Sequence, residues 1–319
     1  MKKIVHLLLL FIVFSACNNK SKVEKEVEEI PLEIKVSRFD KVFFETPINE
    51  LSKAKKQFPM FYPAQIQDSV WINKMNNPLW RELYSEVQNK FGDFKIQKTE
   101  LEETFRYLKY YFPKTKIPKV YTLIYEVDAN TKTIFADSIV LISLEMYLGK
   151  NHKFYQYPEY QRQNFEPKQM MPDLIASFAD SKIKYPKDKT LLSKMIYAGK
   201  ILYLKDLILP RFSDAEKIGY LPSQITFCND NESFVWQYFI ENKLLFNTDS
   251  KLDSQFINSA PFSKFYLEID NETPGRIGTW VGWQIVRSYM KNNTITLENL
   301  LKTDAETIFN QSKYKPKKI

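Results

Sequence analysis

The residue types that most often carry catalysis and metal binding are scarce in this chain. Its 319 residues include two histidines, His6 and His152, and two cysteines, Cys17 and Cys228. Because zinc sites need imidazole or thiolate ligands and disulfide frameworks need several cysteine pairs, both are disfavoured. A Cys228–His152 pair could form a thiol-protease dyad, but no local signature accompanies it, and a buried free thiol is the commoner state. We therefore predict no catalytic residue, no metal ligand and no cofactor.

Cys17 is the exception, because its surroundings predict a covalent modification. A short positive start is followed by a mainly apolar run of thirteen residues from Ile4 to Ala16. This run is shorter than the roughly 20 apolar residues of a membrane-spanning helix and is typical of a signal peptide. The small residues before Cys17 resemble a lipobox, so we predict that residues 1–16 are removed and that Cys17 carries palmitate. A plain signal peptide and an uncleaved anchor are the alternatives.

The net charge falls once the signal peptide is removed. The full sequence carries a formal charge of +8, and the loss of Lys2 and Lys3 lowers it to +6. Four lysines stand in the last seven residues, so the remaining body carries about +2. A nearly neutral body on an exported protein argues against nucleic acid as a partner.

The mature chain divides by composition into three parts. Residues 17–30 mix lysines and glutamates with few apolar residues, which predicts a polar tether after Cys17. Residues 31–311 have a globular composition without a repeat or linker, which favours a single domain. Residues 312–319 form a basic tail.

Helical periodicity dominates the domain, so we predict an α+β fold that is mostly helical with a small sheet. Segments 120–127 and 133–142 are rich in β-branched and aromatic residues and are predicted to form a hairpin or two adjacent strands. The expected helices cover 47–57, 63–75, 78–91, 98–112, 167–180, 188–209, 222–246, 252–258, 274–290 and 297–310.

Three of the seven glycines, Gly275, Gly278 and Gly282, fall on one face of the expected helix 274–290. Thr273 would cap this helix, with Pro274 in its first turn. Because each glycine inside a helix costs about 1 kcal/mol relative to alanine, the bare face needs a reason. It would either pack closely against another element or be approached by a ligand or partner. Glu272 and Arg276 would lie at the rim of such a site, and Trp280 and Trp283 are further candidates for the cleft or for partner binding.

Several runs of residues carry a family resemblance. They are Arg38 to Asp40, Leu148 to Phe154, Arg162 to Asp173, Met195 to Asp206, Ala260 to Phe265 and Trp283 to Tyr289. Together with the lipobox, they resemble the gliding motility lipoprotein GldB of Bacteroidetes over nearly the whole mature chain. The resemblance implies a membrane-anchored component required for gliding, with no assigned reaction.

That family is in turn distantly similar to predicted zinc proteases, whose helix after a strand pair carries His-Glu-x-x-His. The corresponding helix here, Met170 to Phe178, has no histidine. The resemblance therefore implies a zincin-like scaffold without metal, or pseudo-protease. Its cleft would be bounded by Asp173, Tyr197, Gly199 and the 272–283 segment.

These observations predict a periplasm-facing lipoprotein, anchored through acylated Cys17, that acts as a non-catalytic part of the gliding machinery and binds other motility proteins. Asn18 replaces the aspartate that can hold enterobacterial lipoproteins in the inner membrane, which favours the outer membrane. The alternative is a hydrolase or peptide-binding pseudo-protease that uses a cleft beside helix 274–290.

Overall fold

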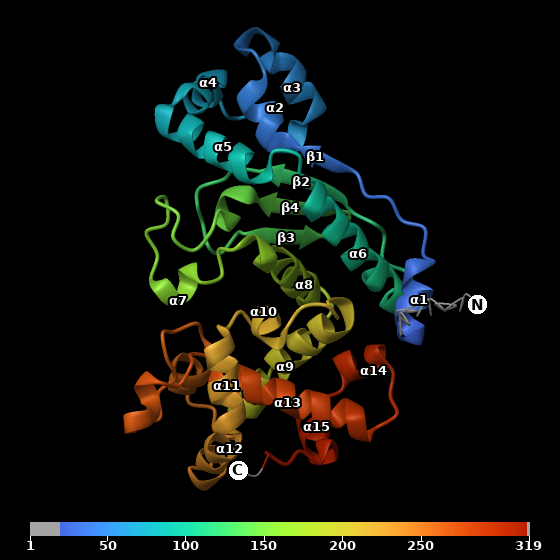
Figure 1. The fold of residues 1–319 in the computed structure, drawn as a ribbon, viewed down its shortest axis with the longest axis vertical. Coiled ribbons are helices and arrows are strands. Elements are labelled where there is room, and N and C mark those ends of the chain that lie inside the picture. The colour runs from blue at the N-terminus through green and yellow to red at the C-terminus, as the bar shows by residue number, and fades with distance from the viewer. Residues whose placement is uncertain (1–19, 318–319) are drawn as a thin grey trace, which may run out of the picture.

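The computed structural model describes residues 20–317, so the expected signal peptide (residues 1–16), Cys17 and the last two residues lie outside the described part. Helices surround one small mixed sheet (Figure 1), which confirms the predicted α+β class. Within the described residues, no helix is both long and apolar enough to cross a membrane.

The sheet has the strand order β1-β2-β4-β3. Strands β1 (Val36–Arg38), β2 (Lys119–Leu123) and β4 (Ile139–Ser143) run parallel, and β3 (Thr133–Ala136) is antiparallel to β4. The predicted strand 133–142 is therefore itself a hairpin, because Asp137 adopts a left-handed conformation and reverses the chain. Of the two arrangements expected for 120–127 and 133–142, the hairpin is wrong, because β2 and β4 run parallel, whereas β2 and β4 do lie side by side as two adjacent strands.

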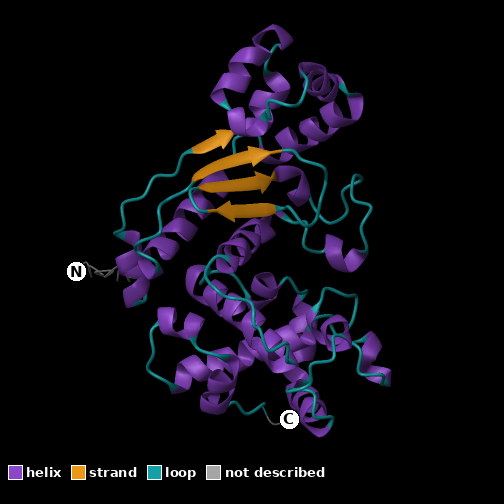
Figure 2. Ribbon diagram, turned by 180° about the vertical axis from the view of Figure 1, so that it is seen from behind, coloured by secondary structure: helices purple, strands orange, loops and turns teal. Residues whose placement is uncertain are grey.

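Helices lie beyond both edge strands of the sheet, β1 and β3, and cover one of its faces (Figure 2). Beyond β1 lie α2 (Phe39–Glu45), α3 (Leu51–Gln57), α4 (Asp68–Asn76) and α5 (Pro78–Phe91). Helix α8 (Met170–Asp180) packs beside β3, and α6 (Lys95–Tyr111) packs against α8 and α9. Asn77 caps α5 and Pro78 occupies its first turn, as the sequence predicts for this helix.

The second half of the chain is helical. Its central pair is α9 (Leu191–Ile208) and α13 (Ile277–Asn292), which make the most extensive helix contact in the described chain. Around them lie α10 (Asp214–Ile218), α11 (Pro222–Asp230), α12 (Glu232–Glu241), a π-helical turn (Asp253–Ile257), α14 (Leu297–Lys302) and α15 (Ala305–Ser312). The short α7 (Glu159–Arg162) belongs to the connection between sheet and α8.

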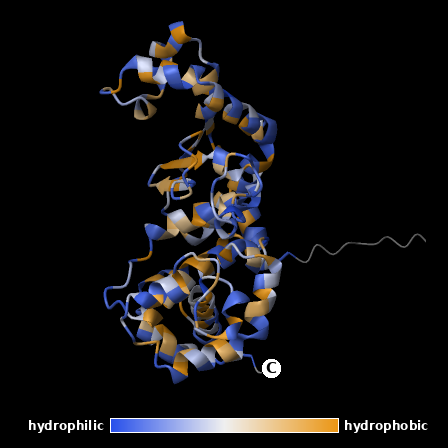
Figure 3. Ribbon diagram, turned by 90° about the vertical axis from the view of Figure 1, so that its left-hand side faces the viewer, coloured by the Kyte–Doolittle hydropathy of each residue, from blue (hydrophilic) through white to orange (hydrophobic). Residues whose placement is uncertain are grey.

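Two hydrophobic clusters fill the interior. One joins the sheet to the helices of the first half, and the strands are mostly hydrophobic in Figure 3. The other surrounds α13 in the second half. Helix α9 belongs to both, because Leu192 and Met195 lie in the second cluster while Leu204 and Ile208 lie in the first.

The two ends of the described chain differ from the expected tether and tail. Residues Lys22–Glu28 form α1, closed by a Ser21–Glu24 capping box, and Val27 is buried. Tyr314 packs its ring on Trp236 and donates a hydrogen bond to Glu232 (Oη to Oε1, 2.7 Å). Charge composition alone hides these contacts, because each segment packs through one apolar or aromatic side chain, Val27 or Tyr314, among charged neighbours.

Candidate functional site

The glycine face of α13 is used for helix packing. A β-carbon at Gly282 would overlap the carbonyl oxygen of Met195 on α9, and one at Gly199 would overlap the carbonyl oxygen of Gly282. The two glycines therefore allow the backbones of α9 and α13 to touch where the helices cross. Of the two interpretations offered by the sequence, close packing is the one that the contacts support.

The start of α13 lies three residues later than the sequence predicts. Arg276 precedes the helix in a left-handed conformation, so Thr273 and Pro274 belong to the preceding turn. A β-carbon at Gly275 would overlap the Ala260 carbonyl, and one at Gly278 would press on the Phe256 carbonyl. The predicted cap was wrong because the chain must turn tightly here to bring α13 against α9.

The other residues of the expected cleft are spread over separate environments. Trp280 and Trp283 are buried in the second cluster, and Glu272 is exposed. Arg276 donates to the Ile218 carbonyl (Nη2 to O, 2.7 Å). Tyr197 packs edge-on against Tyr185 and donates a long hydrogen bond to Asp180 (3.4 Å). None of these positions lines the cavity at the open face of the sheet or the cavity at the ends of α6 and α8, and they do not converge on one point.

Asp173 is neutralised within the first half. Lys132 Nζ lies 2.6 Å from its Oδ2, and the Tyr147 hydroxyl donates to the same oxygen at 3.0 Å. Burial raises the pKa of Tyr147 well above its ordinary value, so the phenol stays protonated and keeps donating. The carboxylate is thus engaged in holding β3, the turn before it and α8 together.

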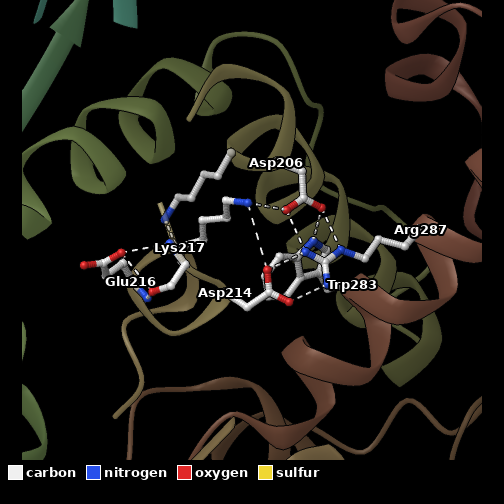
Figure 4. Close-up of polar contacts among 8 residues, drawn as sticks. Asp206, Asp214, Glu216, Lys217, Trp283 and Arg287 are labelled. Atoms are coloured by element: carbon white, nitrogen blue, oxygen red, sulfur yellow. Dashed lines mark hydrogen bonds and ion pairs between the residues drawn. The ribbon is translucent and has the colours of Figure 1, made fainter. Parts of the chain in front are cut away.

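A second polar cluster joins α9, α10 and α13 (Figure 4). Arg287 makes paired hydrogen bonds of 2.7 to 2.8 Å to Asp206 and to Asp214, and its guanidinium lies 3.7 Å above the Trp283 ring. Lys217 Nζ lies 3.0 Å from Asp206, and Trp283 Nε1 donates to the same carboxylate at 2.9 Å. Two cations, Arg287 and Lys217, pair with two carboxylates, and nearly all of the guanidinium N–H groups donate hydrogen bonds. This arrangement is typical of a cluster that holds helices together.

The thiol of Cys228 and the imidazole of His152 lie in different parts of the described structure. Cys228 is buried in the second cluster, and burial raises the pKa of its thiol. His152 lies beside α5, with Nε2 3.7 Å from Glu86. Among residues 20–317, no three His, Cys, Asp or Glu side chains group closely enough to hold a metal ion.

The candidate functional site is a cavity of about 630 Å³ on the face of the sheet that α6 and α8 leave open. Val120, Thr122, Val140 and Ile142 point into the core, so the alternate residues point the other way. Those alternate residues include Leu123, Ile134 and Leu141, which are apolar although no helix of the described chain fully covers them. Phe39, Phe43, Phe61 and Trp71, from α2 to α4, form the facing wall. We call this space the aromatic cavity.

The rim of the aromatic cavity is apolar and exposed. Met60, Val70, Tyr125 and Ile134 are between 38% and 51% exposed. Lys74 is the cationic group at the rim, stacked 3.7 Å above the Trp80 ring and 3.6 Å from Glu126. Exposed apolar side chains gathered around one cavity are typical of interaction sites.

Two polar groups beside the cavity lack partners. Trp71 Nε1 and Glu145 Oε2 are buried without a hydrogen bond in the described structure, while Glu145 Oε1 accepts from the Tyr125 N–H at 3.0 Å. Burial raises the pKa of Glu145 to about 7, against the opposing effects of that N–H and of Lys74. Glu145 thus titrates near neutral pH directly behind a cavity wall.

We expect Glu145→Gln to remove a pH dependence of stability. Below the ordinary pKa of 4.5, Glu145 is protonated in both states; as the pH rises towards 7, only the unfolded state ionises, which favours unfolding. The free energy of unfolding of Glu145→Gln should therefore gain on the order of 3 kcal/mol relative to the parent protein between pH 4.5 and 8. Urea titrations at both pH values measure this, and exposed Glu33→Gln is the control that should show no such gain.

The sequence did contain one signal for this site. Strand β4 is apolar at four consecutive positions, Ile139 to Ile142, whereas a strand with one solvated face alternates apolar and polar residues. The sequence could not predict the facing wall, because residues 39–74 build this wall, whereas the strands β2, β3 and β4 that it faces lie at 119–143.

The sequence model of a family described as gliding motility protein GldB matches residues 20–316. Searches of curated proteins and of solved structures found no match for the chain.

Proposed function

Because this chain belongs to the family of the gliding motility protein GldB, we propose that it is a lipid-anchored, non-catalytic component of the gliding machinery whose aromatic cavity binds another motility protein. The occupant is an apolar segment of that partner, laid over the open face of the sheet. The observation that carries the proposal is the uncovered apolar sheet face with its exposed apolar rim.

The dimensions and composition of the aromatic cavity suit a few large side chains. Ligand sites are typically apolar spaces of about 300 to 1,000 Å³ with a small number of polar groups, and the cavity of about 630 Å³ falls in this range. Aromatic side chains such as Phe39 and Trp71 dominate binding energy at protein interfaces. The charged pair of Lys74 and Glu126 at the rim would orient the segment.

The anchoring part of the proposal rests on the sequence before the described region. Cys17 follows a signal peptide and a lipobox, and acylation there would hold the protein at a periplasm-facing membrane surface. Asn18 after the cysteine favours the outer membrane. In support of a non-catalytic role, the carboxylates of Asp173, Asp206 and Asp214 are all engaged in internal ion pairs.

Charged substitutions at the rim should stop gliding without unfolding the protein. In Met60→Glu/Val70→Glu, both side chains are about half exposed, so the melting temperature should change little. Burying two carboxylates against an apolar partner should weaken binding by about tenfold or more. The measurements are cell spreading on agar and recovery of motility proteins with the purified variant after crosslinking.

The matched control places the same charges on apolar residues of similar exposure in the second half. Leu221 and Ile240 are 40% and 47% exposed and lie on or beside α11 and α12. Leu221→Glu/Ile240→Glu should glide normally. Normal gliding and normal partner recovery in the rim variant would refute the proposed role of the cavity.

A further inference from the structure

A second cavity of about 630 Å³ lies on the side of the molecule where the described chain begins. Phe112 and Phe178 form part of its floor, and four exposed lysines surround it: Lys114, Lys116, Lys182 and Lys302. We call it the lysine groove. The end of α6, the end of α8 and α14 meet there, and Figure 1 shows α1 and α14 on the same side of the molecule.

The lysine groove has an excess of positive charge. Its carboxylates are Asp137 and Glu298, and Glu298 pairs with Lys302 at 2.6 Å. Lys114, Lys116 and Lys182 have no carboxylate within ion-pair distance in residues 20–317. The groove therefore presents cations above an aromatic floor, and it lacks the internal neutralisation seen around Asp173 and Asp206.

The position of α1 connects this groove to the proposed anchor. Tyr110 donates to Glu26 of α1 at 2.8 Å, and the neighbouring Tyr111 lines the groove. Arg106 donates to the carbonyls of Ile30 and Leu32, which fixes the segment after α1 on the same helix. The first described residue, Lys20, is three residues from Cys17, a chain length that spans at most about 11 Å.

From this reach and this charge we infer that the lysine groove lies against the membrane and binds the phosphate headgroups of anionic phospholipids. The inference rests on the proposed acylation of Cys17, because the acyl chain is what holds this side of the molecule near the bilayer. The carboxylates of α1 are largely offset: Glu26 and Glu28 are paired with Lys22 and Lys20, Glu24 closes the capping box, and Glu29 at the helix end is matched by the charge of Lys25. Ile117, 36% exposed next to Lys116, supplies an apolar contact at the same surface.

Lysine accessibility on the native lipoprotein tests the inference. The full mature protein is reconstituted into vesicles of phosphatidylcholine alone or mixed equally with phosphatidylglycerol, and its amines are acetylated by a water-soluble ester and read by mass spectrometry. The four groove lysines should react about threefold or more slowly in the anionic vesicles. Lys56, Lys150, Lys251 and Lys264 are also exposed but lie outside the groove, so their rates should not change.

The arms of the experiment separate the possible failures. Equal rates for the groove lysines in both vesicles would overturn the inference while leaving anchoring intact. Protection by inorganic phosphate in detergent, without vesicles, would also overturn it, because it would show a soluble anion site. A Cys17→Ser variant should leave the membrane fraction of cells; its retention there would refute the anchor and, with it, this inference.

Discussion

Gly282→Ala should destabilise the protein by about 2 kcal/mol or more. Its β-carbon would overlap the Met195 carbonyl oxygen, which belongs to the backbone of α9 and cannot rotate away. Overpacking of this kind costs about 1 to 3 kcal/mol and occasionally more, while alanine recovers only about 1 kcal/mol of helix propensity. We place the expected loss at the upper end because the nearest atoms to the new methyl group are all backbone atoms of Met195.

The measurement is the free energy of unfolding from a denaturant titration. Lys291→Ala, at an exposed position near the end of the same helix, is the control and should change stability by less than about 0.5 kcal/mol. If Gly282→Ala were as stable as the parent protein, the close contact between α9 and α13 would be wrong.

Arg287→Met should cost about 3 kcal/mol, the largest effect expected of any side-chain deletion in the second half. The variant leaves the carboxylates of Asp206 and Asp214 close together, with Lys217 as their remaining cation. Removing one partner of a buried ion pair costs about 3 to 5 kcal/mol, and we expect the lower end because Asp214 is 40% exposed. Thermal and denaturant unfolding at pH 7 give the value.

A double-mutant cycle with Asp214→Asn and a pH series identify the cause. Burial raises the pKa of Asp214, but the hydrogen bonds and charge of Arg287 outweigh it, so the pKa is lowered from 3.8. The stability contributed by this pair is therefore present above pH 3.8 and is lost as the pH falls below it. The stability difference between the parent protein and Arg287→Met should shrink at pH 3. A difference that stays constant, or no coupling in the cycle, would mean that lost packing on Trp283 causes the effect.

The parts of the fold that the sequence predicted well are those set by local signals. The boundaries of α5 follow from Asn77, Pro78 and the apolar spacing after them. The start of α13 was missed because tertiary packing, and not capping, places Arg276 in a left-handed turn. Likewise, the Asp137 turn lies inside a run of apolar residues, so periodicity alone reads β3 and β4 as one strand.

The candidate site was harder to predict than the fold. The sequence indicated that the glycines of α13 matter. A helix that faces a ligand and a helix that packs closely on another both need a face without side chains, so the sequence cannot distinguish the two. The position of Met195 on α9, against Gly282, shows that the face is used for packing. The aromatic cavity, in contrast, brings Phe61 and Trp71 together with strands β2, β3 and β4, the first of which begins at Lys119. No periodicity links such distant segments.

The sharing of α9 between the two hydrophobic clusters also bears on how the protein melts. If the helices around α13 separated, Met195 and Leu192 would be exposed to water, and α9 could then no longer present Leu204 and Ile208 to the other cluster. Neither half retains a complete interior without this helix. The two halves should therefore lose their structure in one cooperative transition, and amide hydrogens in both should exchange with solvent through the same global opening.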